Sequence, residues 1–230
     1  MIIPSKRRTF KRFAALAASP RYTQTRFLMY EALHGISLKG AILDIGGTNH
    51  SKYYSLMHLD GPVTKLNVSN EHDGGCDIQH DCNLPLPFAD ASFDHVLSLN
   101  TFEHVRHYEL AIAEALRVCK AGGTFLFQVP YLYRVHGVPY DYTRLTPQYW
   151  EELLREMGLS SEKFFIEPLV WDNFATGASF FERSFPRWLR PLVRGLFLLP
   201  GLFTEAFPSR KRKRRREDDY AVAFSIRGQK

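Results

Sequence analysis

The chain has 230 residues, of which 45% are hydrophobic and 23% charged. This length and balance predict one domain with a full hydrophobic core and exclude a largely disordered chain. The formal net charge of +6 is local, because the run from Arg210 to Arg216 carries seven cations and the remainder sums to 6 − 7 = −1.

Residues 1–24 form a basic N-terminal extension whose apolar patch, "FAALAA", is shorter than the core of a signal peptide usually is. The three cysteines, Cys76, Cys82 and Cys119, are odd in number and lack the spacing of metal ligands. They predict neither a disulfide framework nor a zinc site. We therefore expect a reducing, cytoplasmic setting and predict no metal site.

Helical and strand-like segments alternate along the first half of the chain. In "RFLMYEALHGI" the apolar residues recur at helical spacing and Gly35 is a plausible stop, which predicts an opening helix. Residues 50–60 could form the next helix. Strands are expected over residues 41–46, 62–68, 75–79 and 93–99.

The central segment "EHVRHYELAIAEALRVCK" has apolar residues along one helical stripe, which predicts a helix over residues 103–120. Gly122 and Gly123 follow directly and predict its end. The apolar run after these glycines predicts a strand that ends at Pro130.

The last regular segments follow the same alternation. Thr146 as N-cap, Pro147 at the first helical position and Gly158 as stop predict one more helix. Strands are expected over residues 163–170 and 218–229. Apolar strands that alternate with amphipathic helices predict an α/β fold with a mostly parallel sheet covered on both faces. Ligands bind to such sheets beyond the carboxyl ends of the strands.

The first buried strand runs directly into two glycines, in "AILDIGGTNH". Glycines there let the backbone turn tightly and approach a ligand. The run is not the dinucleotide pattern G-x-G-x-x-G, since Thr48 and Ser51 occupy its later glycine positions, and it lacks the Gly-Lys-Ser/Thr of a P-loop. The negative charge of Asp44 would disfavour a pyrophosphate and suits a ligand with a cationic end.

These residues resemble the first motif of the class I S-adenosylmethionine (SAM)-dependent methyltransferases, acid-x-Gly-x-Gly-x-Gly. Asp44 and Gly46 are in register, while Thr48 and His50 replace the later glycines. Three further stretches are similar to this family in the same order. They are "LPLPFADASFDHVLSLNTFEHV", "RVCKAGGTFLFQVP" and "HGVPYDYTRLTPQYWEELLREMGL", and the similarity spans residues 25–170.

The resemblance implies a Rossmann-like, seven-stranded, mostly parallel sheet with helices on both faces and an antiparallel last strand, in a methyltransferase domain over residues 25–230. It implies SAM as the cofactor, with the methionine part beside Asp44, the ribose beside Asn67 and the adenine beside Asp81. The departing methyl group would lie near Asn100. The implied cofactor-binding residues are Asp44, Gly46, Gly47, Asn67, Asp81, Cys82 and Asn100.

Some of these residues have structural explanations as well. Asp44 could brace a turn. Asn100 and Glu103 make an N-x-x-E pattern, which is typical of a helix N-cap with a reciprocal acid. His50 could fill the space of a missing glycine or lie on a helix surface. Loss of the later glycines could also leave a protein of this fold that binds without catalysis.

The residues predicted for catalysis or acceptor contact are His104, His136 and Tyr140. His104 lies three positions before His107, so the two could share a helix face, and histidine can act as a base at neutral pH. His136 and Tyr140 belong to a loop rich in aromatic and charged residues. The alternative is a packed loop stabilised by a pair between Asp141 and Arg144.

Residues 171–216 are an insertion before the last strand. Arginines are spaced there among large apolar residues, and the uncharged stretch from Gly195 to Thr204 is too short to span a bilayer. We expect an anionic membrane surface as its partner. A lid, a dimer contact and an RNA-binding extension are the alternatives. Nucleic acid is not expected, because the apolar and basic blocks are largely segregated.

The sequence therefore predicts SAM-dependent methyl transfer to an oxygen or nitrogen atom of a small-molecule, glycan or lipid-linked acceptor. The expected place is the cytoplasm, at the inner face of the membrane if the insertion binds lipid. The alternatives are a non-catalytic binding protein on the same fold and an RNA methyltransferase that uses the basic run.

Overall fold

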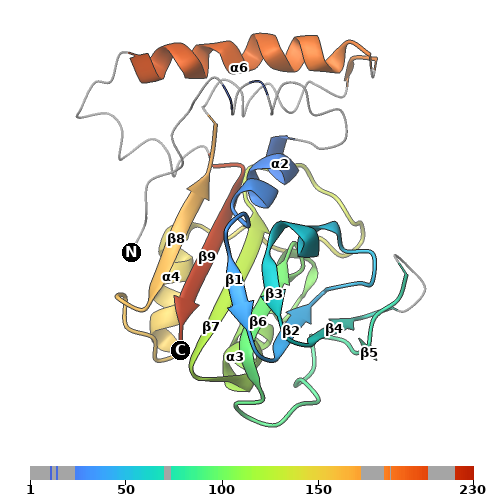
Figure 1. Cartoon of the computed structure of the whole chain (residues 1–230), viewed down its shortest axis with the longest axis vertical. Coiled ribbons are helices and arrows are strands. Elements are labelled where there is room, and N and C mark those ends of the chain that lie inside the picture. Colours follow the sequence, from blue (N-terminus) through green and yellow to red (C-terminus); the bar gives the residue numbers. More distant parts are fainter. Residues whose placement is uncertain are drawn as a thin grey trace.

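A computed structural model of the protein describes residues 24–69, 74–171, 184–186, 188–206 and 221–230, together with Lys11 and Ala14. Seven strands form one sheet in the order β5-β4-β2-β6-β7-β9-β8 (Figure 1). All pairs are parallel except those of β9, which runs antiparallel to both neighbours. The strands are β2 (Ile42–Ile45), β4 (Val63–Asn67), β5 (Ile78–Gln79), β6 (Phe93–Leu99), β7 (Cys119–Pro130), β8 (Phe164–Leu169) and β9 (Ala223–Gln229). The predicted sheet, with its antiparallel last strand, is confirmed.

The helices and a small second sheet cover this central sheet. The helices are α2 (Gln24–Glu31), α3 (Tyr108–Val118), α4 (Pro147–Glu156) and α6 (Arg190–Ala206), and the 3-10 helices are η1 (Lys52–Leu56) and η2 (Phe102–His104). Strands β1 (Ser37–Lys39) and β3 (His58–Asp60) pair in parallel as the second sheet.

Alternate residues of the central strands point to opposite faces, and each face has its own core. Phe125 and Phe127 of β7 pack with Ile112 of α3 and Trp150 of α4. Leu126, between the two phenylalanines, packs instead with residues that precede β1 or lie around η1. The sheet is therefore enclosed on both sides, with α3 and α4 on one face and α2, η1 and the small sheet on the other (Figure 1).

The predicted helix over residues 50–60 is wrong. The structure has η1 followed by β3 there, because tertiary hydrogen bonds override the local pattern. The hydroxyl groups of Tyr53 and Tyr54 donate to the carboxylate of Asp44, and the backbone N–H of His58 donates to the carbonyl of Ile36.

The predicted helix over residues 103–120 is also too long at both ends. η2 ends at His104, α3 begins at Tyr108, and β7 begins at Cys119. Gly122 and Gly123 lie inside β7 and do not stop the helix. The strand extends this far because Cys119 pairs with Phe93 and the backbone N–H of Gly122 donates to the carbonyl of Lys230.

The helix predicted from its capping residues is confirmed as α4. The Thr146 hydroxyl accepts a hydrogen bond from the backbone N–H of Tyr149, and Pro147 is the first helical residue. Gly158 has a φ of +87°, the left-handed conformation in which glycine commonly ends a helix. The opening helix, α2, is shorter than predicted and ends at Glu31.

Truncation of a core residue of α3 should destabilise the fold. Ile112 is fully buried, whereas Leu110 on the same helix is 38% exposed. We expect Ile112→Ala to lower the free energy of unfolding by about 2–5 kcal/mol and Leu110→Ala by less than about 1 kcal/mol. Urea unfolding followed by circular dichroism measures both, and equal losses in the two variants would contradict this packing.

Candidate functional site

Asp44 lies at the carboxyl end of β2 and is fully buried. Its Oδ2 atom accepts hydrogen bonds of 2.6 Å from the hydroxyl groups of both Tyr53 and Tyr54. Its Oδ1 atom is also buried and has no partner among the residues that the structure describes. Burial raises the pKa of Asp44 from 3.8 to about 6, against the lowering effect of the two tyrosine hydrogen bonds.

The two glycines after β2 lie where a side chain has no room. Gly46 has a φ of +87°, and a Cβ atom at this position would lie 1.9 Å from the Thr101 hydroxyl oxygen. A Cβ atom on Gly47 would lie 2.5 Å from Oδ2 of Asp44. Because the turn lies directly against the residue after β6 and over the Asp44 carboxylate, only glycine fits at these two positions.

The residues that replace the later glycines of the motif have structural partners. The backbone N–H of Thr48 donates to the Ser51 hydroxyl at 3.0 Å. The side-chain amide of Asn49 donates to the carbonyl of Gly74. The His50 ring lies against Gly74, where a Cβ atom would be only 2.8 Å from it, so His50 lies in a loop and not on a helix.

The other predicted cofactor residues also lie at the carboxyl ends of strands. At the end of β4, the side-chain amide of Asn67 donates to the carbonyl of Gly46 at 3.1 Å. After β5, Oδ1 of Asp81 accepts from the backbone and side chain of Asn83. Cys82 is buried in the core, and burial raises the pKa of its thiol to about 12. The four strands β2, β4, β5 and β6 thus place the predicted residues along one edge of the sheet.

Asn100 follows β6 in a left-handed conformation, with a φ of +57°. The N-x-x-E capping interpretation is wrong. Thr101 is the N-cap residue of η2 and makes no side-chain capping bond, and both carboxylate oxygens of Glu103 lack a hydrogen-bond partner within the described residues. Glu103 therefore has a role other than capping the helix.

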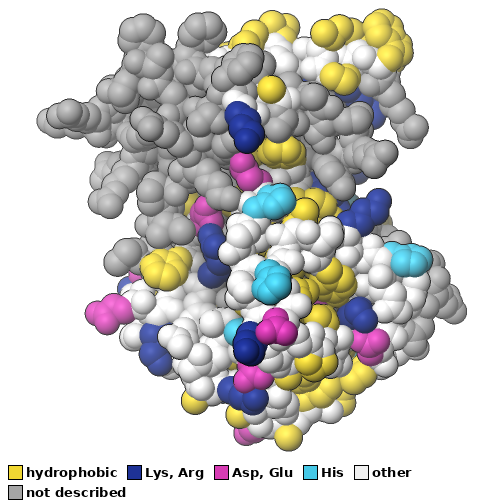
Figure 2. Space-filling model, viewed as in Figure 1, with side chains coloured by type: hydrophobic (Ala, Val, Ile, Leu, Met, Phe, Trp, Pro, Cys, Tyr) yellow, Lys and Arg dark blue, Asp and Glu magenta, His cyan; other side chains and the backbone are white. Residues whose placement is uncertain are grey.

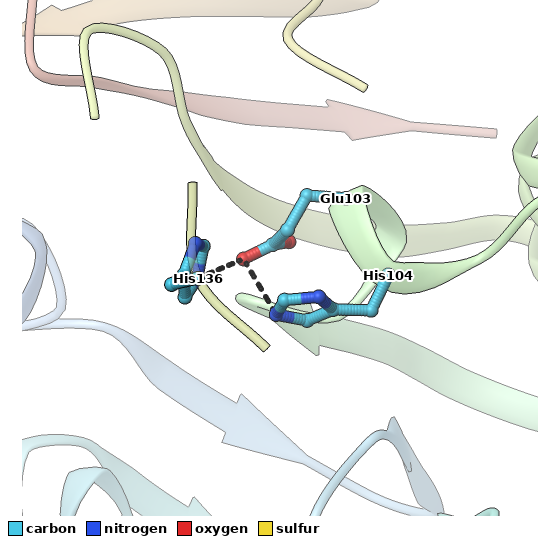
Figure 3. Close-up of side chains that lie close together, drawn as sticks. All are labelled: Glu103, His104 and His136. Atoms are coloured by element: carbon cyan, nitrogen blue, oxygen red, sulfur yellow. Dashed lines mark ion pairs between the residues drawn. The ribbon is translucent and has the colours of Figure 1, made fainter. Parts of the chain in front are cut away.

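Glu103 points toward two histidines, which Figure 3 shows. Its Oε1 atom lies 3.7 Å from Nε2 of His104 and 3.8 Å from Nε2 of His136. The two histidine rings meet edge to face, with centroids 4.7 Å apart. Glu103 is only 1% exposed, and burial raises its pKa to about 8. We call these three residues the Glu–His–His cluster.

A second layer of residues orients the two histidines. Nδ1 of His104 is hydrogen-bonded to the backbone carbonyl of Tyr140. Nδ1 of His136 lies 3.3 Å from Oδ2 of Asp141, and Arg144 binds both carboxylate oxygens of that acid at 2.6 and 2.8 Å. Arg144 holds the pKa of Asp141 down at about 2, while burial lowers the pKa of His136.

The structure thus brings the side chains of His104 and His136 together. Tyr140 contributes to this cluster only through its backbone carbonyl, which contacts His104. Tyr140 as a whole is 62% exposed. His104 and His107 do not share a helix face, because η2 ends at His104 and α3 begins after His107. The predicted pair of Asp141 and Arg144 is confirmed.

Sequence reasoning missed Glu103 as a site residue, and it missed both tyrosines that bind Asp44. The signal for Glu103 was its position, immediately before His104 and shortly after a buried strand end, at the edge where ligands bind. Tyr53 and Tyr54 gave no such signal, because their partner is reached only through the fold.

The comparisons with known proteins agree with this geometry. Residues 43–127 match the family model described as "Methyltransferase domain". The predicted resemblance is confirmed. This matched methyltransferase region runs from β2 into β7 and includes the glycine turn, Asn100 and Glu103.

Two curated relatives, both described as uncharacterized methyltransferases, come from Mycobacterium avium and Mycolicibacterium paratuberculosis. Each is 36% identical to this chain over 108 residues, which cover 41% of this chain. The chain spans 42% of the length of the first relative and 41% of the second.

Solved structures with the same fold include a chain from the complex of the Haloferax volcanii Trm112 methyltransferase activator with a methyltransferase. Its TM-score is 0.56 at 20% identity, over 97% of this chain and 99% of that chain. A SAM-dependent methyltransferase of Thermotoga maritima has a TM-score of 0.55 at 16% identity, over 96% and 94%. Phosphoethanolamine N-methyltransferase 2 of Haemonchus contortus, in complex with SAM, has a TM-score of 0.52 at 15% identity, over 95% and 60%.

The buried Asp44 should make the stability of the protein depend on pH. Because its pKa is higher in the folded state, the folded protein holds a proton that the unfolded chain has released, and stability falls as pH rises from about 4 to about 6. The wild-type free energy of unfolding should fall by up to about 3 kcal/mol over this range. We expect Asp44→Asn to lack this fall, because its side chain does not titrate. Urea unfolding of both proteins between these pH values measures it, and parallel pH profiles would contradict the shift.

Proposed function

We propose that this chain transfers a methyl group from SAM to an oxygen or nitrogen atom of a small-molecule, glycan or lipid-linked acceptor. One observation carries the proposal: the matched methyltransferase region places the glycine turn and the unpartnered, buried Asp44 oxygen at the carboxyl edge of a parallel sheet. This edge is where such sheets bind ligands.

Asp44 fits the methionine end of SAM. An ammonium group would give Oδ1 the partner that it lacks within the described residues and would favour the ionised carboxylate. We assign the ribose to the side of Asn67 and the adenine to the side of Asp81 and Cys82, in the order in which β4 and β5 follow β2 across the sheet.

Methyl transfer from a sulfonium is an in-line displacement. The acceptor lone pair forms a bond to the methyl carbon, the bond from sulfur to that carbon breaks, and S-adenosylhomocysteine leaves. The protein must align donor and acceptor, and a hydroxyl or ammonium acceptor must also lose a proton. The Glu–His–His cluster begins only three residues after Asn100, so we assign the acceptor to this side of the site.

The insertion carries an apolar face that supports a membrane contact. Trp188, Leu192 and Leu196 are 75%, 68% and 65% exposed, and Leu199 continues the same face of α6. Figure 2 shows hydrophobic side chains at the end of the molecule where α6 lies. On the other side of the helix, the indole of buried Trp171 donates to the Leu198 carbonyl.

We propose that this face rests on an anionic membrane surface, at the cytoplasmic side. The basic run from Arg210 to Arg216 follows α6 in the sequence and lies outside the described residues, as does most of the predicted extension over residues 1–24. An apolar helix face followed in the sequence by a run of cations suits an interface of anionic lipid. Within the part of the chain that the structure describes, no helix is both long and apolar enough to cross a bilayer.

Cofactor binding tests the proposed function. We expect calorimetric titration with SAM to show one site, and Asp44→Asn to weaken it at least tenfold, or about 1.4 kcal/mol, because the charge opposite the ammonium is lost. His104→Ala is the matched control: it should keep SAM affinity and lose methyl transfer from tritium-labelled SAM to extracted lipid, glycan and small-molecule fractions.

Absence of SAM binding by the wild-type protein would overturn the proposed methyltransferase activity and favour the alternative of a non-catalytic binding protein. Unchanged methyl transfer in His104→Ala would remove the acceptor assignment alone.

Vesicle binding tests the membrane contact. We expect the protein to cosediment with vesicles that contain phosphatidylglycerol and much less with pure phosphatidylcholine. Leu196→Asp should weaken binding at least tenfold, because a charge replaces an inserted side chain. Val68→Asp, at a similarly exposed position far from α6 in the sequence, should have no effect. Equal binding by wild type and Leu196→Asp would instead favour a lid or a dimer contact.

A further inference from the structure

The Glu–His–His cluster brings one carboxylate oxygen and two imidazole nitrogens close together. A carbonyl oxygen can only accept a hydrogen bond, so the bond to Tyr140 places the His104 proton on Nδ1. In the neutral ring, Nε2 of His104 then carries a lone pair, and this lone pair faces Oε1 of Glu103 at 3.7 Å. Two lone pairs at this distance repel unless a proton or a metal ion lies between them.

His136 is held from its other ring nitrogen by two groups. Its backbone N–H donates to Oδ2 of Asp141, and Nδ1 lies 3.3 Å both from that oxygen and from Nη2 of Arg144, which can only donate to it. A metal ion at Nε2, which lies 3.8 Å from Oε1 of Glu103, would move the ring proton to Nδ1, where Oδ2 of Asp141 can accept it.

We propose that Glu103, His104 and His136 bind one divalent transition-metal ion, through Oε1 of the acid and Nε2 of each histidine (Figure 3). Two imidazoles and one carboxylate suit Zn²⁺ or Fe²⁺ better than Mg²⁺ or Ca²⁺, which prefer oxygen ligands.

The separations of the donor atoms fit such an ion. Tetrahedral zinc with bonds of about 2.0–2.1 Å holds neighbouring ligand atoms about 3.4 Å apart. The pairs with Glu103 are at 3.7 and 3.8 Å, and all three donor atoms lie within 4.8 Å of one another. Small side-chain rotations would bring the three donor atoms to these separations.

Burial and the second layer of residues support the same conclusion. Glu103 is 1% exposed and neither of its oxygens has a hydrogen-bond partner within the described residues, an arrangement that is costly for the ionised carboxylate and that a bound metal ion would stabilise. Each histidine has an acceptor beside its other ring nitrogen, the carbonyl of Tyr140 or, at 3.3 Å, the carboxylate of Asp141, as metal-binding histidines usually have. Gly137 allows the approach, because a Cβ atom there would lie 2.7 Å from the His104 ring.

Three protein ligands leave a coordination position for the acceptor, and this role rests on the proposed function. An acceptor hydroxyl bound to the ion becomes more acidic, as bound water does. Its proton passes to a base from solvent, its oxygen bonds to the methyl carbon, and the bond from that carbon to sulfur breaks. The inference thus narrows the acceptor to one with a hydroxyl group that can bind a metal.

Metal binding can be measured directly on the full chain without a histidine tag, after treatment with a chelator. We expect one equivalent of Co²⁺ to give visible absorption bands of a nitrogen- and oxygen-coordinated site, and Zn²⁺ to displace it. Glu103→Gln and His136→Asn should each lower the Zn²⁺ affinity more than tenfold. His107→Ala, which removes a nearby histidine outside the cluster, should leave it unchanged.

No stoichiometric binding by the wild-type protein, or equal binding by the cluster variants and His107→Ala, would overturn the site. If Glu103→Gln fails to fold, His104→Asn replaces it, because His104 lies partly exposed. Titration of the same preparations with SAM separates the two proposals. Metal binding without SAM binding would support the metal site and overturn the proposed methyltransferase activity. SAM binding without metal binding would support the methyltransferase and overturn the metal site.

Discussion

The contact between Gly46 and Thr101 determines the geometry of the whole site. The turn after β2 lies so close to the residue after β6 that no side chain fits between them. This approach places the Asp44 carboxylate and the start of η2 side by side at one edge of the sheet. Since Glu103 lies two residues beyond Thr101, the contact joins the side assigned to the cofactor to the side assigned to the acceptor.

Two buried carboxylates mark these two sides. Oδ1 of Asp44 and both oxygens of Glu103 have no partner within the described residues, and burial raises the pKa of each acid. Folded proteins rarely leave such groups unpaired, and strongly shifted pKa values gather at functional sites. Asp44 faces the expected position of an ammonium group, and Glu103 faces the Nε2 atoms of two histidines. Each acid therefore fits a cationic ligand, and the two ligands differ in kind.

Much of the fold could be predicted from the sequence, because long apolar strands and well-capped helices carry local signals. The strand over Phe93–Leu99 and the helix after Thr146 are examples. The segment around Tyr53 and Tyr54 was predicted wrongly, since its conformation depends on hydrogen bonds to Asp44 that local spacing does not encode.

The acceptor side was predictable only in part. His104 and His136 were each predicted from their place in the chain, but nothing in the sequence indicates that their rings meet or that Glu103 lies between their Nε2 atoms. The N-x-x-E pattern indicated a helix cap, and the absence, within the described residues, of a side-chain capping bond at Thr101 and at the Glu103 carboxylate excludes that interpretation. The two rings come into contact because of the conformation of the loop around Gly137, and loop conformations are the hardest feature to predict from a sequence.

The most direct test of the central claim is a crystal structure of the protein with S-adenosylhomocysteine bound. We expect the ammonium group of the ligand within hydrogen-bond distance of Oδ1 of Asp44, and its sulfur atom on the side of Asn100 that leads to the Glu–His–His cluster. A ligand bound elsewhere, or one that leaves Oδ1 of Asp44 without a partner, would contradict the assignment of this edge as a methyl-transfer site.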